Sequence, residues 1–71
     1  MISYKKFQKL LIDKNLKKTE VLKMANISNA TMARLNTNEY VSLEVIDKLC
    51  MALDCQPGDL LEYLPAQVQK Q

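Results

Sequence analysis

The stretch from Val21 to Leu35 constrains the fold of this chain most strongly, because it holds two short apolar helical patterns joined by a polar break. The first pattern ends near Ala25, and the second resumes an apolar spacing at Met32 and Leu35 after Asn26-Ile27-Ser28. Isolated helices shorter than about 12 residues are marginal in water, so each needs a partner. Two short helices crossing at a tight turn form a helix-turn-helix, whose second helix can present one face outward.

Charge is divided unevenly along the 71 residues. Residues 1–34 hold eight Lys or Arg and two Asp or Glu, a net charge of +6, whereas residues 35–71 hold two Lys and six Asp or Glu, a net charge of −4. The formal net charge of +2 therefore hides a basic half that contains the helix-turn-helix pattern. A concentrated positive potential of this kind attracts phosphate groups.

The length of the chain allows one domain of modest stability. We expect that domain to span residues 1–66, with residues 67–71 as a frayed tail. The sequence has two Cys and no His, too few ligands for a closed zinc site, so we expect neither a metal nor a cofactor. We interpret Cys50 and Cys55 as small buried hydrophobes in a reducing cytosol, with a disulfide between them as the alternative.

Several broad classes of protein do not fit this sequence. It opens without a signal peptide and has no run of about 18 apolar residues, so we expect a cytoplasmic protein with no membrane span. It also lacks a histidine, a glycine-rich phosphate loop and a nucleophile beside a base. We therefore expect no enzymatic activity, and we interpret the acidic residues of the second half as a solvated surface.

Serines mark three helix starts. Ser3, Ser28 and Ser42 each follow an apolar residue and precede another by four positions, which is the pattern of an N-cap with a hydrophobic staple. Helices are predicted over about Tyr4–Lys14, Lys18–Ala25, Asn29–Asn36, Leu43–Leu53 and Pro57–Tyr63. Left-handed terminators are predicted at Asn15, Asn26 and Asn38. No segment alternates β-branched residues with period two, so the predicted fold class is all-α, a compact five-helix domain.

The predicted helix over 29–36 has a face suited to the DNA major groove. At 100° per residue, Met32 and Leu35 fall on its inner side. Its outward candidates for reading bases are Asn29, Ala30, Ala33 and Arg34. Asn can bond an adenine edge, Arg can fork onto guanine O6 and N7, and alanine methyls can contact thymine methyls. Arg34 is the only arginine in the chain, although a solvated surface cation is the alternative interpretation.

Polar residues around this helix are candidates for phosphate contacts. Lys17, Lys18 and Thr19 stand at the start of the preceding helix, where free N–H groups also attract phosphate. Further candidates at or beyond the outward face are Thr31, Asn36, Thr37 and Asn38. A solvated surface charge is the alternative for any single lysine.

The C-terminal part suggests a surface for self-association. Leu60, Leu61, Tyr63 and Leu64 place four large apolar residues within five positions, too many for one short helix to turn inward. We expect Tyr63, with Leu61 or Leu64, to stay exposed and form a homodimer interface. The alternative is that all four residues close the base of the core.

The segment Leu16–Asn38 resembles the Cro/phage-repressor type (XRE-family) helix-turn-helix. Its central run is Lys18-Thr-Glu-Val-Leu-Lys-Met-Ala-Asn-Ile-Ser-Asn-Ala-Thr-Met-Ala-Arg34. The run Val41–Leu61 looks like the fourth and fifth helices of that family, and the match covers roughly residues 3–64. The stretch from Cys55 to Tyr63 is especially similar to small stand-alone bacterial regulators.

The resemblance implies a five-helix domain whose third helix reads DNA with the four outward residues named above. It also implies phosphate contacts near Lys18, Thr31 and Asn38. The chain departs from the family where Lys18 replaces a frequent Gln and Asn26 a frequent Gly, and where residues 36–38 replace a Glu-Asn-Gly-like run. We expect a sequence-specific, repressor-like transcriptional regulator that binds double-stranded DNA. A protein-interaction module of the same fold, such as an antitoxin, is the alternative.

Overall fold

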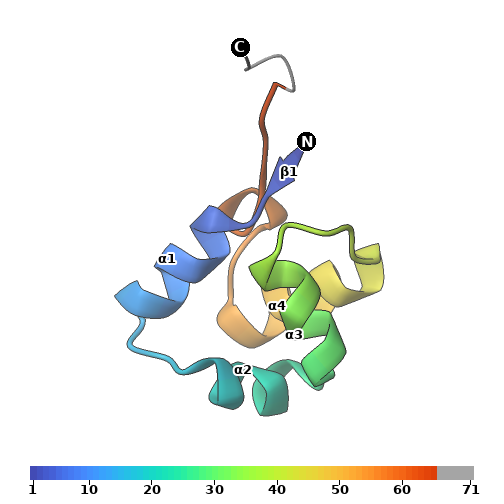
Figure 1. Cartoon of the computed structure of the whole chain (residues 1–71). Coiled ribbons are helices and arrows are strands. Elements are labelled where there is room, and N and C mark those ends of the chain that lie inside the picture. Colours follow the sequence, from blue (N-terminus) through green and yellow to red (C-terminus); the bar gives the residue numbers. More distant parts are fainter. Residues whose placement is uncertain (66–71) are drawn as a thin grey trace.

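The structure, a computed structural model, describes residues 1–65. Within them, four helices and a single 3₁₀ turn are framed by two short strands (Figure 1). In chain order these elements are β1 (Ile2–Ser3), α1 (Lys5–Asp13), α2 (Lys18–Ala25), α3 (Asn29–Asn36), α4 (Leu43–Leu53), η1 (Pro57–Asp59) and β2 (Glu62–Tyr63). The predicted bounds of α2, α3 and α4 are confirmed, and α1 is one residue shorter at each end than predicted. The tail expected over residues 67–71 and the expected domain end at residue 66 lie outside the described residues.

The prediction of a fifth helix was wrong, and so was the purely α-helical fold class. Pro57 begins only one 3₁₀ turn, after which the chain extends and Glu62–Tyr63 pairs antiparallel with Ile2–Ser3. A continuing helix would need the Leu60 carbonyl for its own ladder, but that carbonyl accepts a 3.1 Å bond from the Phe7 N–H. The first turn of α1 has free N–H groups, and satisfying one of them draws the chain out of a helical path.

The two strands escaped sequence analysis because each has only two residues, too few to show a period-two alternation. Their register places Ile2 opposite Tyr63 and Ser3 opposite Glu62. The N-terminal ammonium group and the amide of Leu64 extend the ladder, since Met1 N donates to Leu64 O at 2.8 Å and Leu64 N donates to Met1 O at 2.7 Å. The resulting ribbon runs away from the helices and brings both ends of the described chain together (Figure 1).

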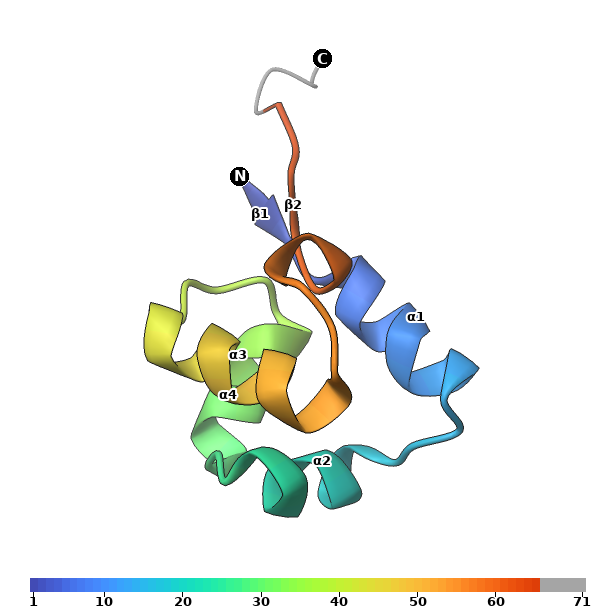
Figure 2. The same ribbon diagram turned by 180° about the vertical axis from the view of Figure 1, so that it is seen from behind.

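The core lies between the helices and is closed by the turn at η1. α4 packs against α2 and η1, and α1 packs against η1 (Figure 2). The buried hydrophobic residues of the core are Tyr4, Phe7, Leu11, Val21, Ala25, Met32, Leu35, Ile46, Leu49, Leu53 and Leu60. Because α3 contributes only two of these side chains, most of its surface remains free. No helix in residues 1–65 is long and apolar enough to cross a membrane.

Two of the three predicted serine caps are confirmed. Ser28 Oγ accepts the Thr31 N–H at 3.1 Å, and Ser42 Oγ accepts the Val45 N–H at 3.3 Å. The cap predicted at Ser3 was wrong: Ser3 lies in β1 and its Oγ accepts from Lys5 N at 3.2 Å, while Tyr4 occupies the N-cap position. Strand pairing holds Ser3 in extended backbone, one residue before the N-cap position.

Left-handed backbone ends the helices as predicted. Asn15, Asn26 and Asn38 have φ angles of 57°, 55° and 60°, and Asp54, which was not predicted, has 53°. Asparagine and aspartate tolerate this region better than other side chains, so the chain turns without glycine at these four places.

Candidate nucleic-acid interface

The turn between α2 and α3 is fixed by local backbone bonds. Asn26 is left-handed and ends α2, and the Ile27 N–H donates to Leu22 O at 3.1 Å. Ser28 then caps the first turn of α3. This sequence of terminator, half-buried Ile27 and N-cap sets the direction in which α3 leaves the turn.

The helix α3 has one buried and one free face. Met32 and Leu35 are 5% and 0% exposed, so they anchor the helix in the core. All four residues predicted to read bases lie exposed on α3, namely Asn29, Ala30, Ala33 and Arg34. The ion pairs within residues 1–65 join Lys6 to Glu62 and Lys48 to Glu44, and neither involves Arg34. The face therefore combines a small-residue surface with an amide at one end and a guanidinium at the other.

The start of α2 carries the predicted lysines in exposed positions. Lys17, Lys18 and Thr19 are all exposed. Lys17, and not a serine, occupies the N-cap position of α2. The Glu20 carboxylate accepts the Lys17 N–H at 2.8 Å and so stabilises the first turn. Sequence analysis overlooked Glu20, although an acidic residue at the third helical position is a known N-terminal signal. Its charge at this end of α2 opposes phosphate binding there, so the lysines must supply the attraction.

Of the four further candidates for phosphate contacts, three have side chains that form hydrogen bonds with other groups of the protein. The hydroxyls of Thr31 and Ser28 lie 3.0 Å apart and share a hydrogen bond. Thr37 Oγ1 donates to the Glu39 carboxylate at 2.6 Å, and it also lies 3.1 Å from the Ala33 carbonyl oxygen. Asn36 is exposed, and its side chain makes no hydrogen bond recorded in the described part of the chain.

Asn38 is the third of the phosphate-contact candidates that form hydrogen bonds within the protein, and its bond is to a distant part of the chain. Its Oδ1 accepts the Tyr4 N–H at 2.9 Å, a bond between residues 34 positions apart. Tyr4 is 2% exposed, and its hydroxyl donates to Glu39 O at 2.8 Å. Burial raises the pKa of the Tyr4 phenol above its ordinary value of 10.0, so the phenol stays protonated and able to donate at neutral pH. No local pattern in the sequence signals these bonds.

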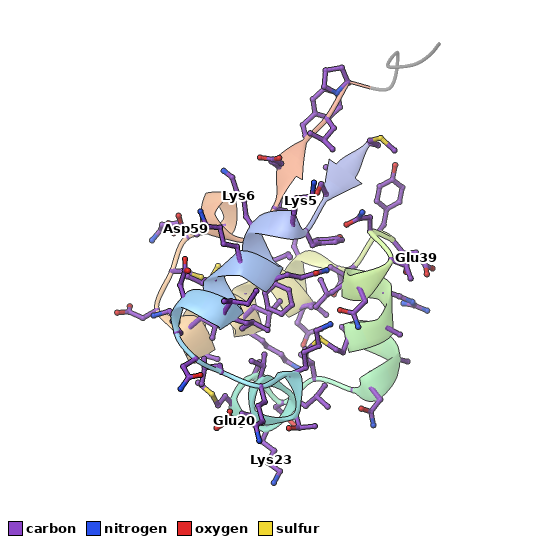
Figure 3. All side chains as sticks on the ribbon, turned by 60° about the vertical axis from the view of Figure 1, so that its left-hand side comes forward. Lys5, Lys6, Glu20, Lys23, Glu39 and Asp59 are labelled. Atoms are coloured by element: carbon purple, nitrogen blue, oxygen red, sulfur yellow. The ribbon has the colours of Figure 1, made fainter. Side chains whose placement is uncertain are left out.

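Charged groups are distributed over both ends of the molecule. Lys5 and Lys6 lie near the strands, at the end opposite Glu20 and Lys23 of α2 (Figure 3). The Lys6 ammonium group donates to Gly58 O at 3.1 Å and lies 3.9 Å from the Glu62 carboxylate. Lys6 is thereby engaged with the C-terminal segment.

The C-terminal apolar residues divide between the core and the surface. Leu60 is fully buried and Leu61 is half-buried, whereas Tyr63 is 70% exposed and Leu64 is 37% exposed. The alternative in which all four close the core is therefore wrong. Two large apolar side chains stand on or beside β2, at the exposed end of the ribbon.

The two cysteines are free and half-buried at the C-terminal end of α4. The Cys55 N–H donates to Cys50 O at 3.1 Å, which closes the last turn around the left-handed Asp54. Burial raises the pKa of the Cys55 thiol to about 11, and the neighbouring Cys50 thiol adds to the rise. No group of three or more potential metal ligands occurs within residues 1–65.

Comparisons with known proteins agree with this geometry. Residues 6–66 match the family model of the Cro/C1-type HTH DNA-binding domain. YozG of Bacillus subtilis (strain 168), an uncharacterized HTH-type transcriptional regulator, is 32% identical over 56 residues, which are 76% of this chain and 67% of YozG. The crystal structure of the transcriptional regulator VanUg, Form II, matches with a TM-score of 0.86 at 45% identity, covering 90% of this chain and 85% of that chain.

The family model spans α1 through β2, so it matches the framework that positions α3 as well as the helix-turn-helix itself. The resemblance predicted from Leu16–Asn38 is confirmed. The chain belongs to the Cro/C1-type helix-turn-helix DNA-binding family.

Proposed function

We propose that this chain is a sequence-specific, repressor-like transcriptional regulator that reads the DNA major groove with α3. The observation that carries the proposal is the free face of α3, where every predicted base-reading residue is exposed. The side chains of Ala30 and Ala33 are short, so the helix can approach base edges closely. The names of YozG and VanUg, both transcriptional regulators, support this function over the antitoxin-like alternative.

Each residue on the free face has a distinct role in the proposal. Arg34 donates its fork to guanine O6 and N7, and Asn29 bonds an adenine edge. Ala30 and Ala33 contact thymine methyl groups. Arg34 lies in the last turn of α3 and Asn29 in its first, so the two polar readers address opposite ends of a short recognition sequence.

Phosphate contacts supply affinity without sequence preference. We assign them first to Lys17, Lys18 and Thr19 at the start of α2, and to Asn36 at the end of α3, because these side chains are exposed. Thr31 and Thr37 can take part only by rearranging the hydrogen bonds that they make within the protein.

A homodimer on a two-fold DNA site completes the proposal. A single helix-turn-helix reads only a few base pairs, so two copies on half-sites are the usual way to reach specificity. Tyr63 and Leu64, together with the half-buried Leu61, offer an apolar surface for a second copy. The complex would assemble on nucleoid DNA in the cytoplasm.

Selection of duplexes from a randomised pool tests the proposed function. The wild-type chain should enrich a defined sequence, and Arg34→Ala should relax the preference at one base pair at a cost of about 1–3 kcal/mol on the preferred site. Arg34→Lys is the matched control, because it keeps the charge and removes the planar fork. Failure of the wild type to enrich any sequence at two salt concentrations would refute base reading.

A further inference from the structure

The end of α3 is tied to the start of α1 by a small set of hydrogen bonds. Asn38 turns the backbone with a φ of 60°, and Glu39 N then donates to Arg34 O at 2.9 Å. The Asn38 side chain points toward α1, where its Oδ1 accepts the Tyr4 N–H at 2.9 Å. One residue thus both turns the chain after α3 and bonds to the N-cap residue of α1.

Tyr4 completes the connection from the other side. Its ring is buried and its hydroxyl donates to Glu39 O at 2.8 Å. Glu39 is also bonded through its carboxylate to the Thr37 hydroxyl at 2.6 Å. Glu39 follows α3 at the end of the molecule where Lys5 begins α1 (Figure 3). We call Tyr4, Asn38 and Glu39 the clamp.

The clamp holds the last turn of α3, which carries Arg34, the only cationic residue of this helix. The Arg34 carbonyl accepts the bond that closes the turn into the clamp, so displacement of Asn38 or Glu39 moves the last turn of α3. A helix of eight residues has little stability of its own and depends on such contacts for its orientation. Bidentate recognition of a base tolerates errors of only about 0.5 Å in the supporting residues.

We propose that Tyr4 and Asn38 are positioning residues for base reading, which hold Arg34 in register with the base edge without contacting DNA themselves. This inference rests on the proposed function. It also gives Asn38 a role different from the phosphate contact predicted from the sequence. Through Ser3, which pairs with Glu62, the clamp continues into the ribbon and so connects α3 to the proposed dimer surface.

Three substitutions separate the interactions within the clamp. Asn38→Gly keeps the left-handed turn and removes the acceptor, whereas Asn38→Asp keeps both the turn and the acceptor. Tyr4→Phe removes only the hydroxyl bond. Asn15→Gly is the matched control, because Asn15 is also left-handed and its side chain has no hydrogen bond recorded in residues 1–65.

The readout is the ratio of affinities for the selected duplex and a random duplex, measured at two salt concentrations on variants that circular dichroism shows to be folded. Asn38→Gly and Tyr4→Phe should each lower this ratio about fivefold, the equivalent of one hydrogen bond, with the salt dependence unchanged. Asn38→Asp should keep the wild-type ratio, although its negative charge weakens binding to both duplexes. Asn15→Gly should leave the ratio and both affinities unchanged.

Two results would overturn the inference. If Asn38→Gly weakens binding to both duplexes equally, so that the affinity ratio stays at the wild-type value, Asn38 binds a phosphate. If the folded variants Tyr4→Phe and Asn38→Gly keep the wild-type ratio, the clamp does not position Arg34. Should Asn38→Gly fail to fold, Tyr4→Phe still decides the matter. Failure of the proposed function is recognised separately, because the wild type itself would then fail to discriminate between the duplexes.

Discussion

The residues of the proposed interface have three different roles. Some read bases, some attract phosphate, and some hold the other residues in place. The exposure of the proposed base-reading residues was predictable from the sequence, because the outward face of a short helix follows from its period once Met32 and Leu35 are assigned to the core. The positions of the groups that hold the others in place were not predictable. The bond between Tyr4 and Asn38 joins positions 34 apart, and only the tertiary fold brings the residue before α1 to the turn after α3.

At the residue scale, Lys18 tests the phosphate contacts. Lys18→Ala should weaken binding to selected and random duplexes alike and reduce the salt slope by about one unit, because one released counterion is lost. Lys48→Ala is the control, since Lys48 lies on α4 beside Glu44 and should leave the slope unchanged. An unaltered slope for Lys18→Ala would remove this lysine from the interface.

The Cys55 thiol predicts a pH dependence of folding stability. Its pKa rises from an ordinary 9.0 to about 11 in the folded chain, so between these values the unfolded chain loses the thiol proton first. The contribution of Cys55 is therefore fully present below about pH 9 and is lost as the pH rises toward 11. Urea unfolding of wild type and Cys55→Ser at pH 8 and pH 10.5 checks this. The wild type should lose more stability, and parallel losses would contradict the assignment.

At the scale of the elements, strong local signals were sufficient for α2, α3 and α4. Ser28 and Ser42 cap the helices that they were predicted to start, and three asparagines end helices in left-handed backbone. The helix predicted over Pro57–Tyr63 does not form beyond Asp59, because backbone groups of this segment form hydrogen bonds with distant parts of the chain. Leu60 O accepts from α1, and Glu62–Tyr63 pairs with a strand that begins the chain. Such long-range competition leaves no trace in a local pattern.

Helix capping by Ser42 predicts a measurable share of the stability. Ser42→Ala removes the acceptor for the Val45 N–H and should lower the free energy of unfolding by about 1 kcal/mol. Ser42→Asp keeps an acceptor at the same position and should retain most of that stability. Denaturant unfolding distinguishes the variants. An equal loss in both, or no loss in Ser42→Ala, would mean that the cap does not stabilise α4.

For the whole molecule, the division of charge along the sequence agrees with the proposed orientation on DNA, since α2 and all but the last two residues of α3 belong to the basic half. The exposure of Tyr63 and Leu64 also agrees with the expected apolar surface near the C-terminal end. Whether a second copy covers that surface remains a prediction, as does every contact with DNA.

The dimer has its own test. Sedimentation of the complex should find two chains on each selected duplex, and the selected sites should be palindromic. Tyr63→Ser should shift the complex toward one chain per duplex without lowering the thermal stability, because the side chain is mostly exposed. Ile12→Ser, at a comparably exposed apolar residue on α1, should have no such effect. One wild-type chain per duplex on sites without palindromy would refute the dimer.

The central claim, that α3 reads bases in the major groove, is tested most directly by methylating guanine N7 in the selected duplex. N7 faces the major groove, and its methylation blocks the acceptor proposed for Arg34. Methylation at one guanine in each half-site should abolish the preference of the wild type and should make no difference to Arg34→Ala. Wild-type binding that is indifferent to N7 methylation at every guanine, yet sensitive to ethylation of phosphates, would contradict the account.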